Sequence, residues 1–102
     1  MNHLIIFAHP NAKGSFGRAI ADRVAKTGQA LGVLTQFRDL YAMNFNPIIS
    51  FEELQVANKG IIPEEVKHEH NLILQADLIS LVYPLWWMGF PAILKGYLDR
   101  VL

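Results

Sequence analysis

The chain has 102 residues, of which 52% are hydrophobic, and nine basic and nine acidic residues give it a formal net charge of zero. This length and composition predict one domain or less with a real apolar core, and they argue against disorder and against an electrostatic surface for nucleic acid or an anionic membrane. The absence of cysteine excludes disulfides, thiolate catalysis and cysteine-bound zinc.

The first 40 residues predict a strand, a helix and a second strand. Leu4 to Ala8 is a short apolar run typical of a strand, and the start of the chain lacks the features of a signal peptide, so we expect a cytoplasmic protein. Ser15 can cap a helix from Phe16 to about Ala30, where apolar residues recur at helical spacing. Moderate alternation over Val33 to Leu40 predicts the second strand.

A long connection, Tyr41 to Pro63, separates the second strand from the next helix. Within it, Phe51 to Ala57 could add a helical turn. Pro63 suits a helix start because acidic residues follow it, and that helix should run to about Gln75. We expect the carboxylates of this region to be solvated helix charges, namely Glu52, Glu53, Glu64, Glu65 and Glu69.

The last part of the chain begins with a continuous apolar run, Leu78 to Tyr83, which suits a strand covered on both faces and ended by Pro84. An aromatic turn follows, and then a helix that closes near Asp99 and Arg100, where we expect surface ion pairs. Strands that alternate with helices predict right-handed crossovers and a parallel sheet. We expect the strand order 2-1-3.

The loop between the first strand and its helix, His9 to Phe16, is a candidate anion site. A helix N-terminus offers unpaired N–H groups and the positive end of the dipole, and Ser15 and His9 add side-chain donors. The spacing is neither that of the dinucleotide-binding fingerprint nor that of the P-loop, so the pattern alone is weakly specific. Equally, Ser15 could be a plain helix cap and His9 a hydrogen-bonding residue at a strand end.

The turn after the third strand is unusually aromatic. Ordinary connecting turns are small and polar, whereas this one is built from Tyr83, Pro84, Trp86, Trp87, Gly89, Phe90 and Pro91. These rings could cover a flat ligand, although either tryptophan taken alone could equally be core. A membrane span fits poorly, because the apolar stretch is short and contains two prolines and a glycine.

Both candidate segments follow strands 1 and 3, where the winding of a 2-1-3 sheet reverses and ligands bind. A molecule with an anionic end for His9 and Ser15 and a flat aromatic end for Trp86 and Trp87 is a flavin nucleotide. Backbone donors of the turn could meet the polar edge of its ring. The histidines of the predicted third helix lie two residues apart and share no face, so we expect no metal site there.

Three segments resemble the NAD(P)H:quinone reductase family of flavoproteins, the DT-diaphorase group. They are the loop His9-Pro-x-x-x-x-Ser-Phe, the segment Leu40 to Ser50, and Pro84 to Val101 with its pattern Pro-Leu-x-Trp-x-Gly-x-Pro-Ala-x-Leu-Lys-Gly. The resemblance spans nearly the whole chain. It implies a flavodoxin-like α/β/α fold with strand order 2-1-3 in this chain, a bound FAD or FMN, and two-electron reduction of quinones or related acceptors by NAD(P)H.

The resemblance also implies roles for individual residues. His9, Ser15 and Phe16 would hold the phosphate and ribityl portion of the flavin, and Trp87 would face the nicotinamide or quinone. The full set expected to bind the cofactor is His9, Ser15, Phe16, Gly17, Pro84, Leu85, Trp86, Trp87 and Met88. Two positions depart from the family. Gly17 stands where longer reductases often carry Asn beside the phosphates, so one side-chain contact is lost. Met88 replaces a commoner ring residue, so its stacking on the flavin would be weaker.

Family members also continue past the last helix of this chain, with further strands, a Gly-Gly flavin loop, and the Tyr and His thought to assist hydride transfer. We therefore expect residues 1–102 to be the N-terminal half of a 2-1-3-4-5 domain, inactive alone, whose catalytic residues lie outside it. We prefer FAD to FMN and expect a homodimer. Two alternatives remain open: a non-enzymatic regulatory subunit of a transport system on the same fold, and a flavodoxin-type electron carrier.

Overall fold

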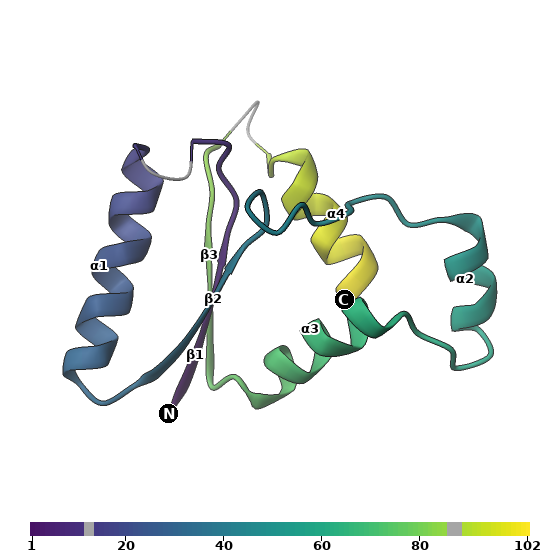
Figure 1. The fold of residues 1–102 in the computed structure, drawn as a ribbon, viewed down its shortest axis with the longest axis horizontal. Coiled ribbons are helices and arrows are strands. Elements are labelled where there is room, and N and C mark those ends of the chain that lie inside the picture. Colours follow the sequence, from purple (N-terminus) through teal and green to yellow (C-terminus); the bar gives the residue numbers. More distant parts are fainter. Residues whose placement is uncertain (12–13, 86–88) are drawn as a thin grey trace.

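A parallel sheet with helices on both faces organises the chain (Figure 1). The structure, a computed structural model, describes residues 1–11, 14–85 and 89–102. In chain order the elements are β1 (Asn2–Phe7), α1 (Phe16–Ala30), β2 (Leu34–Asp39), α2 (Phe51–Ala57), α3 (Glu64–Gln75), β3 (Leu78–Val82) and α4 (Ala92–Val101). Each was predicted from the sequence, and the bounds that were predicted differ from the observed ones by at most about two residues.

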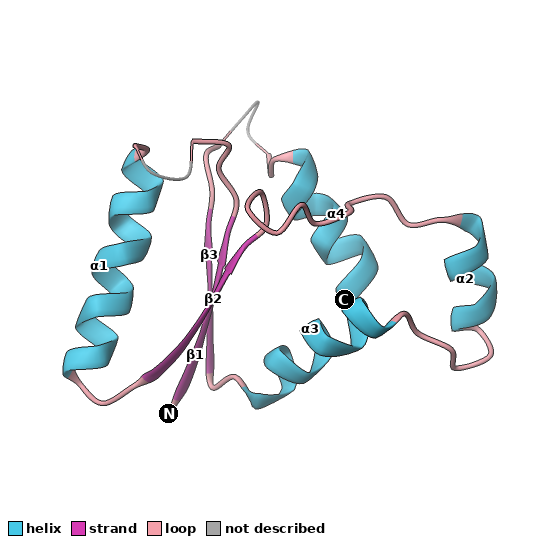
Figure 2. Cartoon of the chain, in the orientation of Figure 1, coloured by secondary structure: helices cyan, strands magenta, loops and turns pink. Residues whose placement is uncertain are grey.

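The predicted strand order is confirmed: β1 lies in the centre, with β2 and β3 paired in parallel on either side. Figure 2 shows the three strands nearly edge-on, between α1 and the other helices. His3 is level with Thr35 of β2 and with Leu78 of β3. Because parallel strands end on the same side, the loops that follow β1 and β3 lie next to each other. Ala8 shows this directly, since its N–H donates to the carbonyl oxygen of Val82 at 3.0 Å.

The two faces of β1 bury alternate residues, as a central strand requires. Ile5 and Phe7 pack with Ala21 of α1 on one face. Leu4 and Ile6 face the larger cluster formed with α3 and α4, whose other fully or nearly fully buried members are Ala8, Leu40, Phe45, Val66, Leu94, Tyr97 and Val101. Figure 1 shows these helices on the two sides of the sheet, which gives the three layers α/β/α.

Strand β3 differs from its prediction, because its apolar run is only partly covered. Leu78, Ile79 and Leu81 keep 46%, 44% and 38% of their surface exposed. The reason is its position at the edge of the sheet, where no further strand pairs with it among the described residues.

Among the residues that the structure describes, no helix is long and apolar enough to cross a membrane.

Candidate functional site

A pocket of about 250 Å³ lies at the carboxyl ends of β1 and β3, beside the first turn of α1. The described residues that line it are Phe7, His9, Phe16, Gly17, Ile20, Val82, Tyr83 and Pro84. Four of the residues predicted to bind a cofactor therefore share one hollow. The loops that follow β1 and β3 and the start of α1 meet at this end of the molecule in Figure 1.

Ser15 caps α1 and orients its first turn. Its backbone is extended, with φ −84° and ψ 153°, and its Oγ accepts a hydrogen bond from the N–H of Arg18 at 3.0 Å. The cap interpretation is therefore correct, yet a hydroxyl that accepts one bond retains its own proton to donate. The N–H groups of Phe16 and Gly17 have no acceptor within α1, and they lie at the positive end of its dipole. This first turn is suited to an anion.

His9 is held in place by the loop that follows it. Its Nδ1 accepts the backbone N–H of Asn11 at 2.9 Å, and the Oδ1 of Asn11 in turn accepts the N–H of Gly14 at 3.1 Å. The loop therefore fixes the orientation of the His9 ring at the edge of the pocket.

Apolar side chains are exposed around the same pocket. Phe16 and Leu85 keep 82% and 68% of their surface exposed, while Phe90 keeps 41% and packs edge-on against Tyr83 with ring centroids 4.9 Å apart. Exposed apolar groups beside unpaired backbone donors are typical of a site that binds an amphipathic ligand. Trp86, Trp87 and Met88, which we predicted to form the rest of the aromatic wall, lie outside the described residues.

One carboxylate that we expected to be solvated is a buried partner instead. Glu69 is only 2% exposed; Arg38 of β2 donates two hydrogen bonds to it, at 3.1 and 2.7 Å, and the hydroxyl of Tyr97 donates a third at 3.2 Å. Burial first, and then the charge of Glu69, raise the pKa of Tyr97. The prediction failed because Glu69 shares the inward face of α3 with Val66, a three-residue spacing that the sequence contained.

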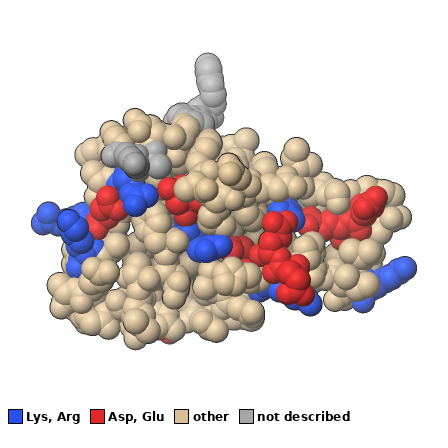
Figure 3. All heavy atoms as spheres, in the orientation of Figure 1, with Lys and Arg blue, Asp and Glu red and all other residues tan. Residues whose placement is uncertain are grey.

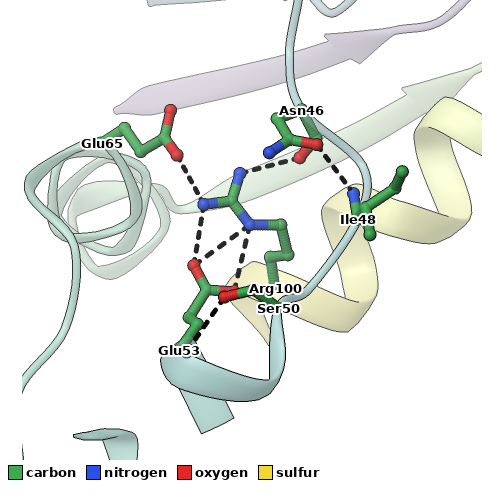
Figure 4. Close-up of polar contacts among 6 residues, drawn as sticks. All are labelled: Asn46, Ile48, Ser50, Glu53, Glu65 and Arg100. Atoms are coloured by element: carbon green, nitrogen blue, oxygen red, sulfur yellow. Dashed lines mark hydrogen bonds and ion pairs between the residues drawn. The ribbon is translucent and has the colours of Figure 1, made fainter.

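Arg100 also contradicts its prediction, because it makes buried contacts rather than surface pairs (Figure 4). Its side chain is 4% exposed and donates to Glu53 at 2.8 Å, to the carbonyl oxygen of Asn46 at 2.7 Å, and to Glu65. The hydrogen bond with Glu53 is the main cause of the raised pKa of Arg100. Its neighbour Asp99 does pair at the surface, with Lys95.

Charge of both signs is spread over the molecule. In the view of Figure 3, basic residues gather over α1 and acidic residues over α2 and α3, with the other sign mixed into both regions.

One of the two histidines of α3, His70, makes a structural contact, since its Nε2 lies 2.6 Å from the carbonyl oxygen of Val101. Within the described ranges, no group of three or more potential ligand side chains could hold a metal ion.

The whole chain, residues 1–102, matches the family model described as having a flavodoxin-like fold. The chain therefore belongs to the flavodoxin-like family, and the fold class predicted from the sequence is confirmed. This agrees with the observed parallel order β2-β1-β3.

Individual proteins within this family show which of its members the chain is similar to. An uncharacterized NAD(P)H oxidoreductase of Haemophilus influenzae is 74% identical over 102 residues, which cover 100% of this chain and 50% of that protein. The solved NAD(P)H:quinone oxidoreductase from Methanothermobacter marburgensis is 38% identical, with a TM-score of 0.88 over 99% of this chain and 53% of the other. General stress protein 14 of Treponema denticola, solved in complex with FMN, is 25% identical, with a TM-score of 0.66 over 99% of this chain and 48% of the other.

These similarities confirm the resemblance to the NAD(P)H:quinone reductase family that the sequence motifs indicated. The chain spans about half the length of the curated relatives it matches.

Proposed function

We propose that the whole protein to which this chain corresponds is a flavin-dependent NAD(P)H:quinone oxidoreductase, which passes two electrons as hydride from NAD(P)H through its flavin to a quinone or a related acceptor. The observation that carries the proposal is the pocket that brings His9, Phe16, Gly17 and Pro84 together at the carboxyl ends of β1 and β3. The similarity to proteins named NAD(P)H oxidoreductase and quinone oxidoreductase supports the reaction class.

The described residues fit a flavin nucleotide in two respects. The first turn of α1 offers unpaired N–H groups and the Ser15 hydroxyl to a phosphate, and the exposed rings and aliphatic groups beside it suit a flat ring system. When bound, the flavin supplies the two-electron redox chemistry. The chain's own part is to hold the phosphate with Ser15 and Gly17, to line the site with His9, and to exclude water with Phe16 and Leu85.

The other half of the wall belongs to the aromatic turn. We assign Pro84, Leu85, Trp86, Trp87 and Met88 to the isoalloxazine ring, with Trp87 also facing the nicotinamide or quinone. FAD is the preferred cofactor because the motifs resemble the FAD-binding branch of the family most closely. The neighbour that carries FMN makes FMN the alternative.

We further propose that residues 1–102 form the N-terminal half of the domain, with a fourth strand pairing along β3. The relatives are about twice as long, and Leu78, Ile79 and Leu81 leave an apolar edge exposed there. Ile20 of α1, 43% exposed, extends the apolar surface on one side of that edge. The residues that assist hydride transfer would then lie in the other half.

The working unit in this proposal is a cytoplasmic homodimer in which two aromatic turns face each other. Phe16, Leu85 and Phe90 all expose apolar surface at this end, and exposed apolar surface is typical of an interface. A symmetric contact there would shield the site from water, which hydride transfer requires.

The test is steady-state NAD(P)H oxidation by the purified whole protein with and without a quinone, together with a matched pair of variants. Phe16 and Phe51 each begin a helix directly after a serine cap, and both are strongly exposed, at 82% and 73%. Phe16→Ala should weaken flavin binding about tenfold, roughly the scale of one lost apolar or stacking contact, whereas Phe51→Ala should not.

Quinone-dependent turnover supports the enzyme. Flavin without such turnover would favour a one-electron carrier, and a co-purifying transport protein without turnover would favour a regulatory subunit.

A further inference from the structure

Helix α2 is attached to the rest of the molecule in an unusual way. It contributes no buried residue to the core, and Figure 1 shows it standing apart from the sheet, beyond α3 and α4. Phe51 and Leu54 keep 73% and 50% of their surface exposed, and Ile48 and Ile61 on either side of the helix keep 72% and 57%. Apolar burial therefore does little to hold residues 48–61, which we call the arm, against the body.

Polar contacts between the arm and the body converge on one side chain. Among the described residues, every hydrogen bond and ion pair that joins the arm to another part of the fold runs between Glu53 and Arg100. The remaining bonds of the arm are internal or end at its base, as when Asn46 Oδ1 accepts the N–H of Ile48 at 3.1 Å. Figure 4 shows Glu53 reaching across to the guanidinium.

That single contact is strong because it is shielded from water. The side chains of Arg100 and Glu53 are 4% and 11% exposed, and the guanidinium also lies 5.3 Å from the centre of the Phe45 ring. Arg100 is independently fixed by Asn46 and Glu65, so it stays in position whether or not Glu53 is present. Removing one partner of a buried, hydrogen-bonded charge pair costs more than breaking an exposed pair, because the other charge is left buried and unpaired.

The space beneath the arm is hollow rather than packed. A half-open pocket of about 160 Å³ lies between the arm and helices α3 and α4, with Ile49, Glu53 and Ile61 on the arm side and Val66, Arg100 and Val101 on the body side. Gly60, with φ +78°, lies at one end of the arm, in a left-handed conformation that a glycine changes at low cost. Opening the arm would therefore break few packing contacts.

We propose that residues 48–61 are a movable arm that opens as a unit while the sheet stays folded, and that the Glu53–Arg100 ion pair is its latch. Opening would uncover the apolar and cationic lining of the pocket. The arm and its ion pair do not involve the flavin or the proposed reaction, so this proposal is tested separately from the proposed function.

Native-state hydrogen exchange on the whole protein tests the latch with a matched pair of variants. Glu52 and Glu53 are neighbours in the first turn of α2. Replacing either one removes the same net charge and a similar interaction between a carboxylate and the helix dipole. Of these two glutamates, Glu53 is the one that contacts Arg100. We expect Glu53→Gln to speed exchange of the α2 amides roughly 10- to 100-fold, the scale of a lost hydrogen bond to a charged group. The amides of β1 should be unchanged, and Glu52→Gln should leave both regions as in the wild type.

Two results would overturn the proposal. If Glu53→Gln and Glu52→Gln exchange alike at α2, the ion pair is not what holds the arm. If Glu53→Gln speeds exchange in β1 as much as in α2, the arm does not open separately from the sheet.

Discussion

Replacing Gly96 with alanine should destabilise the protein, although the same change in an open helix position stabilises. Gly96 lies inside α4, where alanine is ordinarily favoured by about 1 kcal/mol. A Cβ built there would lie 2.2 Å from the Cβ of Pro47, 2.3 Å from its carbonyl oxygen and 2.4 Å from its Cα. Two of these atoms are backbone, so no side-chain rotation relieves the overlap, and α4 must separate from the connection between β2 and α2.

Overpacking of this kind typically costs about 1–3 kcal/mol, and an overlap of roughly 1 Å against backbone falls at the upper end. After the gain in helix propensity, we expect a net loss of about 2 kcal/mol. The matched control is Gly28→Ala in α1, where the nearest atom to a new Cβ is Thr35 Oγ1 at an ordinary 3.5 Å. That variant should gain roughly 0.5–1 kcal/mol.

The assay is urea unfolding of the whole protein, followed by circular dichroism, with midpoints compared at equal m-values. The two substitutions should move the midpoint in opposite directions. If Gly96→Ala is as stable as Gly28→Ala, the close approach of α4 to Pro47 is not a feature of the folded protein.

Three further predictions concern the site, the core and the assembly. Trp87→Ala should weaken flavin retention or nicotinamide use by about 1–3 kcal/mol, the scale of a lost stacked aromatic contact with its burial; unchanged cofactor affinity and turnover would place Trp87 in ordinary core. Because burial and then Glu69 raise the pKa of Tyr97 above its ordinary value, the neutral phenol stabilises the fold below about pH 10, and this contribution is lost as the pH rises further. Unfolding measured between pH 9 and 11 should show a steeper loss for the wild type than for Tyr97→Phe, and parallel curves would contradict the assignment. Sedimentation of the whole protein at micromolar concentration should show a dimer, and a fully active monomer would rule out the shared site.

The order of elements was predictable because local patterns and tertiary packing agree along most of this chain. The apolar run Leu4 to Ala8, the cap at Ser15 and the proline before α3 each specify their element without reference to distant residues. The convergence of His9, Phe16 and Pro84 was also predictable, since parallel strands in the order 2-1-3 must bring the loops after strands 1 and 3 together.

The buried charges could not be predicted with the same rules. Glu69 and Arg100 look like surface residues by type, and their burial depends on Arg38 and Glu53, which are about 30 and 50 residues away in the sequence. The local sequence gives only a weak indication of such long-range pairs. Glu69 lies three residues after Val66, and Arg100 three residues after Tyr97, which places each charged residue on the inward face of its helix. Charged residues on these faces pack inward only when a partner of opposite charge is supplied by another element.

The most direct test of the proposed function is whether the whole protein binds flavin through the pocket at the start of α1. The purified protein should be yellow, and acid denaturation should release FAD or FMN that is identified by its fluorescence. Ser15→Ala, which removes the helix cap and the donor to the phosphate together, should retain less flavin than the wild type. A denatured supernatant with no flavin fluorescence, even after prior incubation with both FAD and FMN, would contradict the account.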